Sequence, residues 1–114
     1  MNISIKRGND RNLRITVKKD DVAQDITGWT IYFAVKRKPN DTDANAIISK
    51  VVTSHEDAAN GVSVIEISGD DTRDEKVGYY HWDIRVKDDA DKEQSSDTGV
   101  FEIVQEIADG VAIS

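Results

Sequence analysis

Apolar and polar residues alternate along most of the chain, beginning close to its start. Every second residue from Leu13 to Val17 is apolar, and the residues between them are polar. Successive side chains of a β-strand point to opposite faces, so this spacing predicts a strand with one buried and one solvated face. Ile3 and Ile5 show the same alternation, and residues 7–10 between the two runs are typical of a turn. The start of the chain therefore predicts a short strand, a turn and a longer strand.

Three later stretches repeat this alternation and identify their buried faces. Odd-numbered residues are apolar in 29–35, even-numbered residues are apolar or aromatic in 80–86, and residues 101 and 103 are apolar on either side of a glutamate. We expect the largest of these side chains to form one cluster between two sheets: Trp29, Phe33, Tyr80, Trp82, Ile84 and Phe101.

Two further runs predict strands without fixing which face is buried. Residues 46–54 are rich in β-branched side chains, but their inward face is ambiguous. A later run has two candidate pairs for its buried face, which are Val62 with Val64 and Ile65 with Ile67. One face cannot hold both pairs without a bulge, so the choice stays open at this point.

Charged segments lie between the strands. Residues 70–76 predict one turn of helix, with Asp70, Asp71 or Thr72 as its N-cap. The basic residues 36–38 end a strand, and we interpret them as a solvated edge that discourages pairing with other sheets.

The spacing of strands and turns predicts the fold. Clusters of Gly and Asp separate about seven strands at intervals of about 8–12 residues, which is typical of a sandwich. The order Gly78, Tyr80, Trp82 supports this, because a Tyr opens a late strand two residues before a core position in immunoglobulin-like domains. We therefore predict an all-β protein, an immunoglobulin-like antiparallel β-sandwich of about seven strands, in a single domain over residues 1–114.

Composition excludes several classes of function. The formal net charge is −7, from 15 basic and 22 acidic residues, which argues against binding a nucleic-acid backbone. The chain has no Cys, so zinc-thiolate sites and cysteine nucleophiles are excluded. No apolar run approaches the length that spans a membrane, and we expect a soluble cytoplasmic protein without a membrane partner.

The sequence predicts no catalytic, cofactor-binding or metal-binding residue. His55 and His81 are the only histidines, and neither completes a Ser-His-acid pattern or a metal-ligand spacing. His81 falls on a wet face, where we interpret it as a surface residue. Residues 41–45 and 88–93 resemble parts of calcium loops, but both are better explained as polar turns. We therefore predict that the protein is not an enzyme.

Four motifs together resemble a known family. They are IKRGNDRNLRITV, DITGWTIYFAVKR, DDT followed by GYYHWDIRV, and GVFEI. The same layout is found in small phage and prophage proteins and in the amino-terminal immunoglobulin-like domain of phage baseplate upper proteins. The resemblance covers nearly the whole chain. It implies a non-enzymatic virion structural module of the tail, baseplate or head-tail region, made in the host cytoplasm and carried in the virion.

Such a module acts by docking to other virion subunits or to itself as a homo-oligomer. We expect the working surface in the two segments that we predict to be least committed to the core, residues 7–12 and 111–114. The candidate interface residues are Arg7, Asn9, Asp10, Arg11, Val111 and Ile113.

A ligand-binding module is the alternative, either for cell-surface carbohydrate or for calcium-dependent adhesion. It requires exposed aromatic side chains, and Tyr32 and Tyr79 fall on the predicted wet faces.

Overall fold

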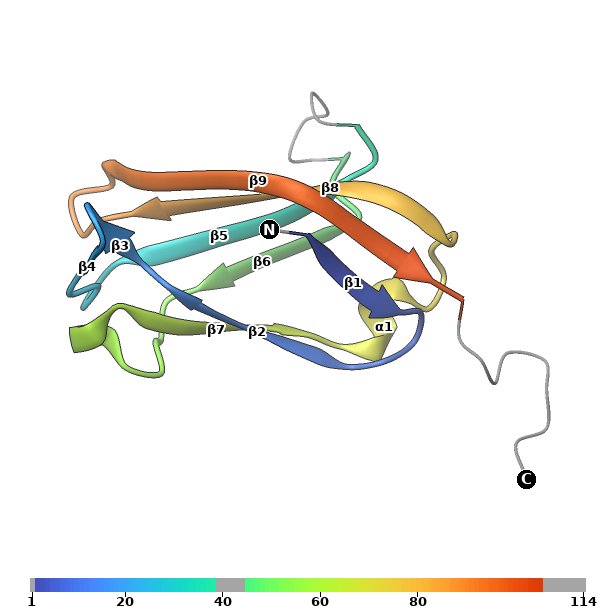
Figure 1. The fold of residues 1–114 in the computed structure, drawn as a ribbon, viewed down its shortest axis with the longest axis horizontal. Helices are drawn as coiled ribbons and strands as arrows, with labels where there is room; N and C mark the ends of the chain where they lie inside the picture. Colours follow the sequence, from blue (N-terminus) through green and yellow to red (C-terminus); the bar gives the residue numbers. More distant parts are fainter. Residues whose placement is uncertain (1, 39–44, 106–114) are drawn as a thin grey trace.

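The structure, a computed structural model, describes residues 2–38 and 45–105 (Figure 1). In chain order its elements are β1 (Ile3–Lys6), β2 (Arg11–Thr16), β3 (Lys18–Lys19), β4 (Val22–Ala23), β5 (Thr30–Lys36), β6 (Ile48–Val52), the 3₁₀ turn η2 (Ala58–Asn60), β7 (Val62–Ile67), α1 (Gly69–Thr72), β8 (Gly78–Lys87) and β9 (Glu93–Val104).

The strands form two unequal layers. The larger sheet has the order β1-β9-β8-β5-β6, and the antiparallel pair β2-β7 lies across it as the second layer (Figure 1). The short β3-β4 hairpin forms a separate two-stranded sheet. This arrangement confirms the predicted all-β sandwich.

One pairing departs from the expected antiparallel pattern. Strand β1 runs parallel to β9, with Ile3 opposite Phe101 and Lys6 opposite Val104. The turn after β1 carries the chain from the larger sheet to the smaller one, so β1 and β2 do not form a hairpin. β1 instead completes the larger sheet beside its last strand.

The core follows the alternation seen in the sequence. The predicted central residues Phe33, Tyr80, Trp82, Ile84 and Phe101 are all at most 7% exposed. The remaining residue of the predicted cluster, Trp29, differs. It precedes β5 in a turn and is partly buried against the edge of the core.

The structure settles the two runs whose buried face was open. In β7, Ile65 and Ile67 are buried and the two valines are only partly covered. In β6, Ile48 is buried while Val51 is 59% exposed. In β6, Ile48 therefore points inward, and the side chains after it alternate between the two faces of the sheet.

Residues 36–38 were predicted to form a solvated edge, and for Lys36 this prediction was wrong. Lys36 is only 5% exposed. It pairs with His81 of β8, and β5 lies inside the larger sheet between β8 and β6 rather than at an edge. The sheet order, which the sequence does not give, accounts for this burial.

Tyr80 makes the hydrogen bond expected of a late-strand tyrosine in a sandwich. Its hydroxyl donates to the carbonyl of Lys76 at 2.6 Å, four residues upstream. Burial raises the pKa of Tyr80, and the nearby Glu75 carboxylate adds to this effect. The hydroxyl therefore stays protonated and fixes the turn that enters β8.

The predicted helical turn is present, but its cap was assigned wrongly. Helix α1 begins at Gly69, so its N-cap is Ser68 rather than Asp70, Asp71 or Thr72. The Ser68 amide donates to Asp71 Oδ2 at 2.8 Å, as in a capping box.

We predict that Trp82→Ala destabilises the fold by about 3–5 kcal/mol, because its indole is 1% exposed at the centre of the sandwich. The matched control Tyr79→Ala, three positions earlier on the same strand and 73% exposed, should change stability by less than about 0.5 kcal/mol. Urea unfolding measures both, and equal losses would contradict this description of the core.

Candidate docking surface

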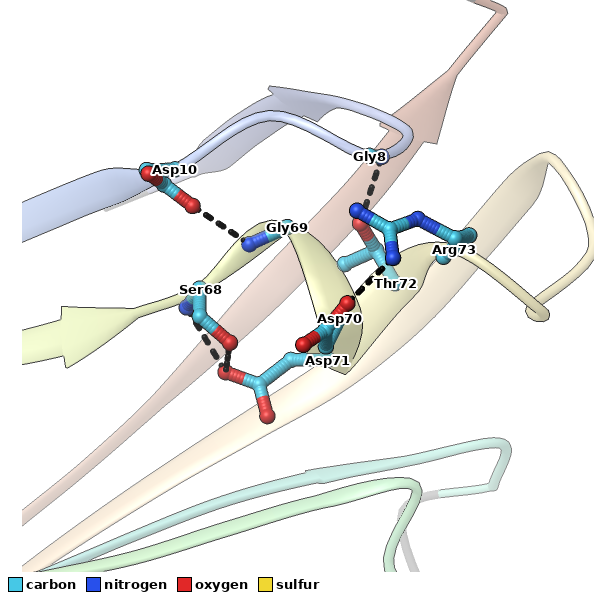
Figure 2. A network of polar contacts seen from close by, with 8 residues as sticks. All are labelled: Gly8, Asp10, Ser68, Gly69, Asp70, Asp71, Thr72 and Arg73. Atoms are coloured by element: carbon cyan, nitrogen blue, oxygen red, sulfur yellow. Dashed lines mark hydrogen bonds and ion pairs between the residues drawn. The ribbon is translucent and has the colours of Figure 1, made fainter.

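A cluster of polar contacts holds the β1-β2 turn against α1 (Figure 2). The Gly8 amide donates to Thr72 Oγ1 at 2.9 Å, and the Gly69 amide donates to Asp10 Oδ1 at 2.6 Å. Thr72 is fully buried. Residues about sixty positions apart in the chain are therefore joined by two hydrogen bonds at the point where the chain changes sheets.

The two segments approach so closely that only glycine fits. A Cβ atom on Gly69 would lie 2.3 Å from the carbonyl oxygen of Gly8, well inside van der Waals contact. Gly8 itself has a φ of 83°, in the left-handed region that glycine adopts without strain. Backbone therefore packs directly on backbone at this junction.

An ion pair extends this junction to the edge of the larger sheet. Lys50 of β6 points inward, and its Nζ lies 2.8 Å from Asp71 Oδ2 in α1. Burial acts to raise the pKa of Asp71, but the hydrogen bonds from Lys50 and Ser68 outweigh it, and the net effect lowers that pKa. Asp71 is thus held as a carboxylate between the helix cap and the sheet.

Both outer edges of the larger sheet carry a cation. On β1, the Arg11 guanidinium donates to the main-chain carbonyl of Ser4. On β6, Lys50 is an inward-pointing charge, a feature that discourages an edge strand from pairing with a foreign strand. Neither edge is therefore a simple template for strand addition.

The outer face of the larger sheet carries the exposed aromatic residues. Tyr32 is 38% exposed, with Lys87 Nζ 5.6 Å from its ring centroid, and it pairs across strands with the exposed Val51. A hollow of about 200 Å³ lies beside it, partly lined by Asp83. Tyr79 is 73% exposed.

An acidic turn connects β8 to β9. Asp88 Oδ1 accepts the amides of Ala90 and Lys92, both at 2.9 Å, so residues 88–92 form a hairpin tip organised by its own side chain. The hydrogen bond from the Lys92 amide is the main cause that lowers the pKa of Asp88. The other calcium-like stretch, residues 41–45, lies almost entirely outside the described residues.

The two histidines have different surroundings. Both ring nitrogens of His55 are engaged, one with Ser63 Oγ at 2.9 Å and the other with the Trp29 carbonyl at 2.7 Å. His81 is partly buried rather than fully on the surface. His55 therefore acts as a structural link between β7 and the turn before β5.

The described part of the chain shows neither a grouped set of metal ligands nor a membrane-spanning helix. No group of three or more His, Cys, Asp or Glu side chains there is arranged to hold a metal ion. None of its helices is long and apolar enough to cross a membrane.

The structure places four of the six candidate interface residues in the β1-β2 turn and its exit. Within this segment, Asp10 and Arg11 both hydrogen-bond to other elements. The Arg7 amide donates to the carbonyl of Val104 at 3.0 Å, and Asn9 is exposed. Whether these residues form an interface stays a prediction.

The two remaining candidates, Val111 and Ile113, lie outside the described residues. They follow β9 in the chain, and β9 ends beside the turn at the contact between Arg7 and Val104. The end of β9 and the β1-β2 turn, far apart in the sequence, therefore lie at the same end of the domain (Figure 1).

Sequence reasoning missed the partners that hold the turn, above all Gly69, Thr72 and Lys50. A single glycine before a charged stretch is an ordinary turn signal, so nothing marked Gly69 as a contact of Gly8. Ser68 followed three residues later by Asp71 was the one available sign, since that spacing is typical of a helix N-terminus.

Comparison with known proteins gives one family and one fold. The model of a family described as BppU N-terminal domain matches residues 1–114. Among solved structures, the N-terminal domain of phage TP901-1 ORF48 matches with a TM-score of 0.60 and 16% sequence identity, over 91% of this chain and 84% of that chain. At this identity the likeness shows a shared fold. No curated protein matches the chain.

We predict that Gly69→Ala destabilises the domain by about 1–3 kcal/mol, because the added methyl group collides with the Gly8 carbonyl. Helix propensity alone predicts the opposite sign, a gain of about 1 kcal/mol. Asp70→Ala, the next residue of the same turn with an exposed side chain, is the matched control. Thermal unfolding decides between the two signs.

We predict that the Lys50–Asp71 contact makes stability depend on pH in the acid range. A lowered carboxyl pKa contributes stability that is complete above the ordinary value of about 3.9 and is lost as the pH falls through the folded value. Asp71→Asn should cost about 1–2 kcal/mol at pH 7, and this difference should shrink as the pH falls below about 4.

The control for this titration is Asp70→Asn, because Asp70 is 79% exposed in its contact with Arg73. Denaturant unfolding at several pH values gives the two curves. A constant gap between wild type and Asp71→Asn across the acid range would contradict the assigned role of the carboxylate.

Proposed function

The chain belongs to the family of BppU N-terminal domains, the amino-terminal domains of phage baseplate upper proteins, and on this premise we propose that it acts by protein–protein docking without catalysis. The observation that carries the proposal is the family match over residues 1–114. The fold shared with the N-terminal domain of phage TP901-1 ORF48 is compatible with it.

The use of reactive side chains in the described residues supports a structural role. His55 bridges two elements through both ring nitrogens, Thr72 receives the Gly8 amide, and Asp71 holds the helix cap and Lys50. The Tyr80 hydroxyl is engaged with the backbone. Groups that serve elsewhere as bases or nucleophiles here stabilise turns and crossings.

The end of the domain that carries the β1-β2 turn is the docking surface that we favour. The contacts of Gly8 and Asp10 with α1 hold this turn in one conformation, so docking there requires little ordering of the backbone. Arg7 and Asn9 lie on it, and β9 ends beside it at Val104.

The partners in this proposal are other virion subunits or further copies of the chain. The net charge of −7 favours a soluble subunit before assembly and disfavours nucleic acid. The subunit would be made in the host cytoplasm and would work in the virion, in the tail or baseplate.

The ligand-binding alternative has weaker support. The hollow beside Tyr32 measures about 200 Å³, below the range of about 300–1,000 Å³ usual for small-molecule sites. Lys87 lies over the Tyr32 ring, where a sugar would stack. A glycan array and a calcium titration of thermal stability test this alternative directly.

We predict that deleting residues 110–114 leaves the stability of the domain within about 0.5 kcal/mol, because they follow β9 and its pairing. The deletion should weaken self-association or binding to the products of adjacent tail genes by about tenfold or more. Co-expression followed by size-exclusion chromatography measures the complex. Tyr79→Ala, exposed on the larger sheet, is the control.

The docking role fails if this deletion and the exposed-turn substitution Asn9→Arg both leave assembly unchanged. Specific binding on the glycan array that is lost in Tyr32→Ala would then favour the ligand-binding alternative.

A further inference from the structure

The step from Asn60 to Gly61 is a candidate for spontaneous covalent modification. Of the asparagines in the chain, only Asn60 is followed by a glycine. The main-chain nitrogen of the next residue can attack the side-chain amide carbon of an asparagine, which is one of the thermolabile residues. A glycine has no Cβ to hinder this approach. Asn60 is also exposed, so water reaches its side chain.

The reaction at such a step is deamidation. The main-chain nitrogen of Gly61 bonds to Cγ of Asn60, its proton passes to solvent, and the side-chain nitrogen leaves as ammonia. One water molecule then opens the resulting cyclic imide at either of its carbonyls. Opening gives an aspartate, or an isoaspartate in which the main chain runs through the side-chain carbon and is one methylene longer. Water is the sole co-reactant.

The structure holds both reacting groups in other contacts. Asn60 Nδ2 donates to Asp57 Oδ2 at 2.9 Å. The Gly61 amide donates to the carbonyl of Ala58 at 3.1 Å, at the end of η2. The nitrogen that must attack is therefore bonded elsewhere, and the side chain that must be attacked is fixed in place. Both contacts have to break before the new bond can form.

Gly61 is also packed against two other segments. It is buried, with a φ of 75°, and a Cβ there would lie 2.6 Å from the Gln24 carbonyl oxygen and 2.8 Å from that of Val17. Its own carbonyl accepts the Val17 amide at 2.8 Å. Asp57 and Val62 exchange two hydrogen bonds across the same turn. The main chain at Gly61 therefore cannot rotate toward the preceding side chain while these segments stay packed.

We propose that Asn60 is a deamidation site and that the packed turn of residues 57–62 gates the reaction. A chain reacts while this turn is locally open, so the rate is set by the fraction of molecules in which the turn is open. The proposal is independent of the docking function, because it concerns the end of β7 that lies away from α1 and the β1-β2 turn.

The isoaspartate product would loosen the end of β2. Its extra methylene lies directly before Gly61, so it displaces the carbonyl that accepts the Val17 amide. Either product also adds one negative charge beside Asp57 in a chain whose net charge is already −7, and the two carboxylates repel each other. A brief opening of the turn is thereby converted into a lasting loss of stability.

The test follows the full chain during incubation at neutral pH, with one sample folded and one unfolded in urea. Peptide mapping by mass spectrometry measures intact and deamidated Asn60. We expect deamidation in the folded sample to be slower by about tenfold or more, because only open molecules react. Asn12, which is followed by Leu13, is the internal control and should stay intact in both samples. Equal rates at Asn60 would overturn the gating, and no product in urea would overturn the site.

Two variants test whether the opening is local. Asp57→Ala removes the partner of Asn60 Nδ2 and should speed deamidation of the folded chain by about fivefold, with the rate in urea unchanged. Gly69→Ala, which weakens the junction at the other end of β7, should leave the rate at Asn60 unchanged. An unchanged rate in Asp57→Ala, or equal acceleration by both variants, would show that the turn does not gate the reaction.

The consequence for stability is measured on the aged protein. Ion exchange separates the modified chains by their added charge, and peptide mapping gives their isoaspartate content. We expect chains with isoaspartate to unfold at a lower temperature than fresh protein, and Asn60→Gln, which removes the reactive step, to keep its unfolding temperature through the same incubation. Modified chains as stable as fresh protein would overturn the described role of the Gly61 contact.

Discussion

The close approach of the Gly8 carbonyl to Gly69 is the constraint on which the rest of the structure depends. At this point the chain leaves the larger sheet and enters the smaller one, so the position of β2 over the core follows from it. Two hydrogen bonds, through Asp10 and Thr72, fix the approach, and the side chain of Thr72 is buried to do so (Figure 2). A methyl group on Gly69 does not fit in the contact.

Helix α1 connects this junction to an edge strand of the larger sheet. Asp71 closes the helix cap and also binds Lys50, which keeps an inward charge on the edge strand β6. Arg11, directly after the turn, covers a main-chain carbonyl on β1 at the opposite edge. Helix α1 and the first residue of β2 therefore each contribute a contact at one edge of the larger sheet.

This distribution is compatible with the docking role that we propose for a small acidic domain. Its turns are held by their own carboxylates, as in residues 88–92, and its histidine at position 55 bridges two elements. The end of the sandwich that carries the β1-β2 turn is the surface that we propose for contact with other proteins. Membership of the family of BppU N-terminal domains indicates that the assembly is a phage baseplate.

The sequence by itself determined the buried face of the strands whose alternation is regular, because a two-residue period is a local property. Phe33, Trp82 and Phe101 were identified in this way, and the spacing of strands and turns predicted the sandwich. Only the tertiary structure decided the parallel pairing of β1 with β9, the burial of Lys36 and the contact of Gly8 with Gly69. These depend on sheet order and on approaches between distant segments, and a local pattern carries no information about which distant segment lies opposite it.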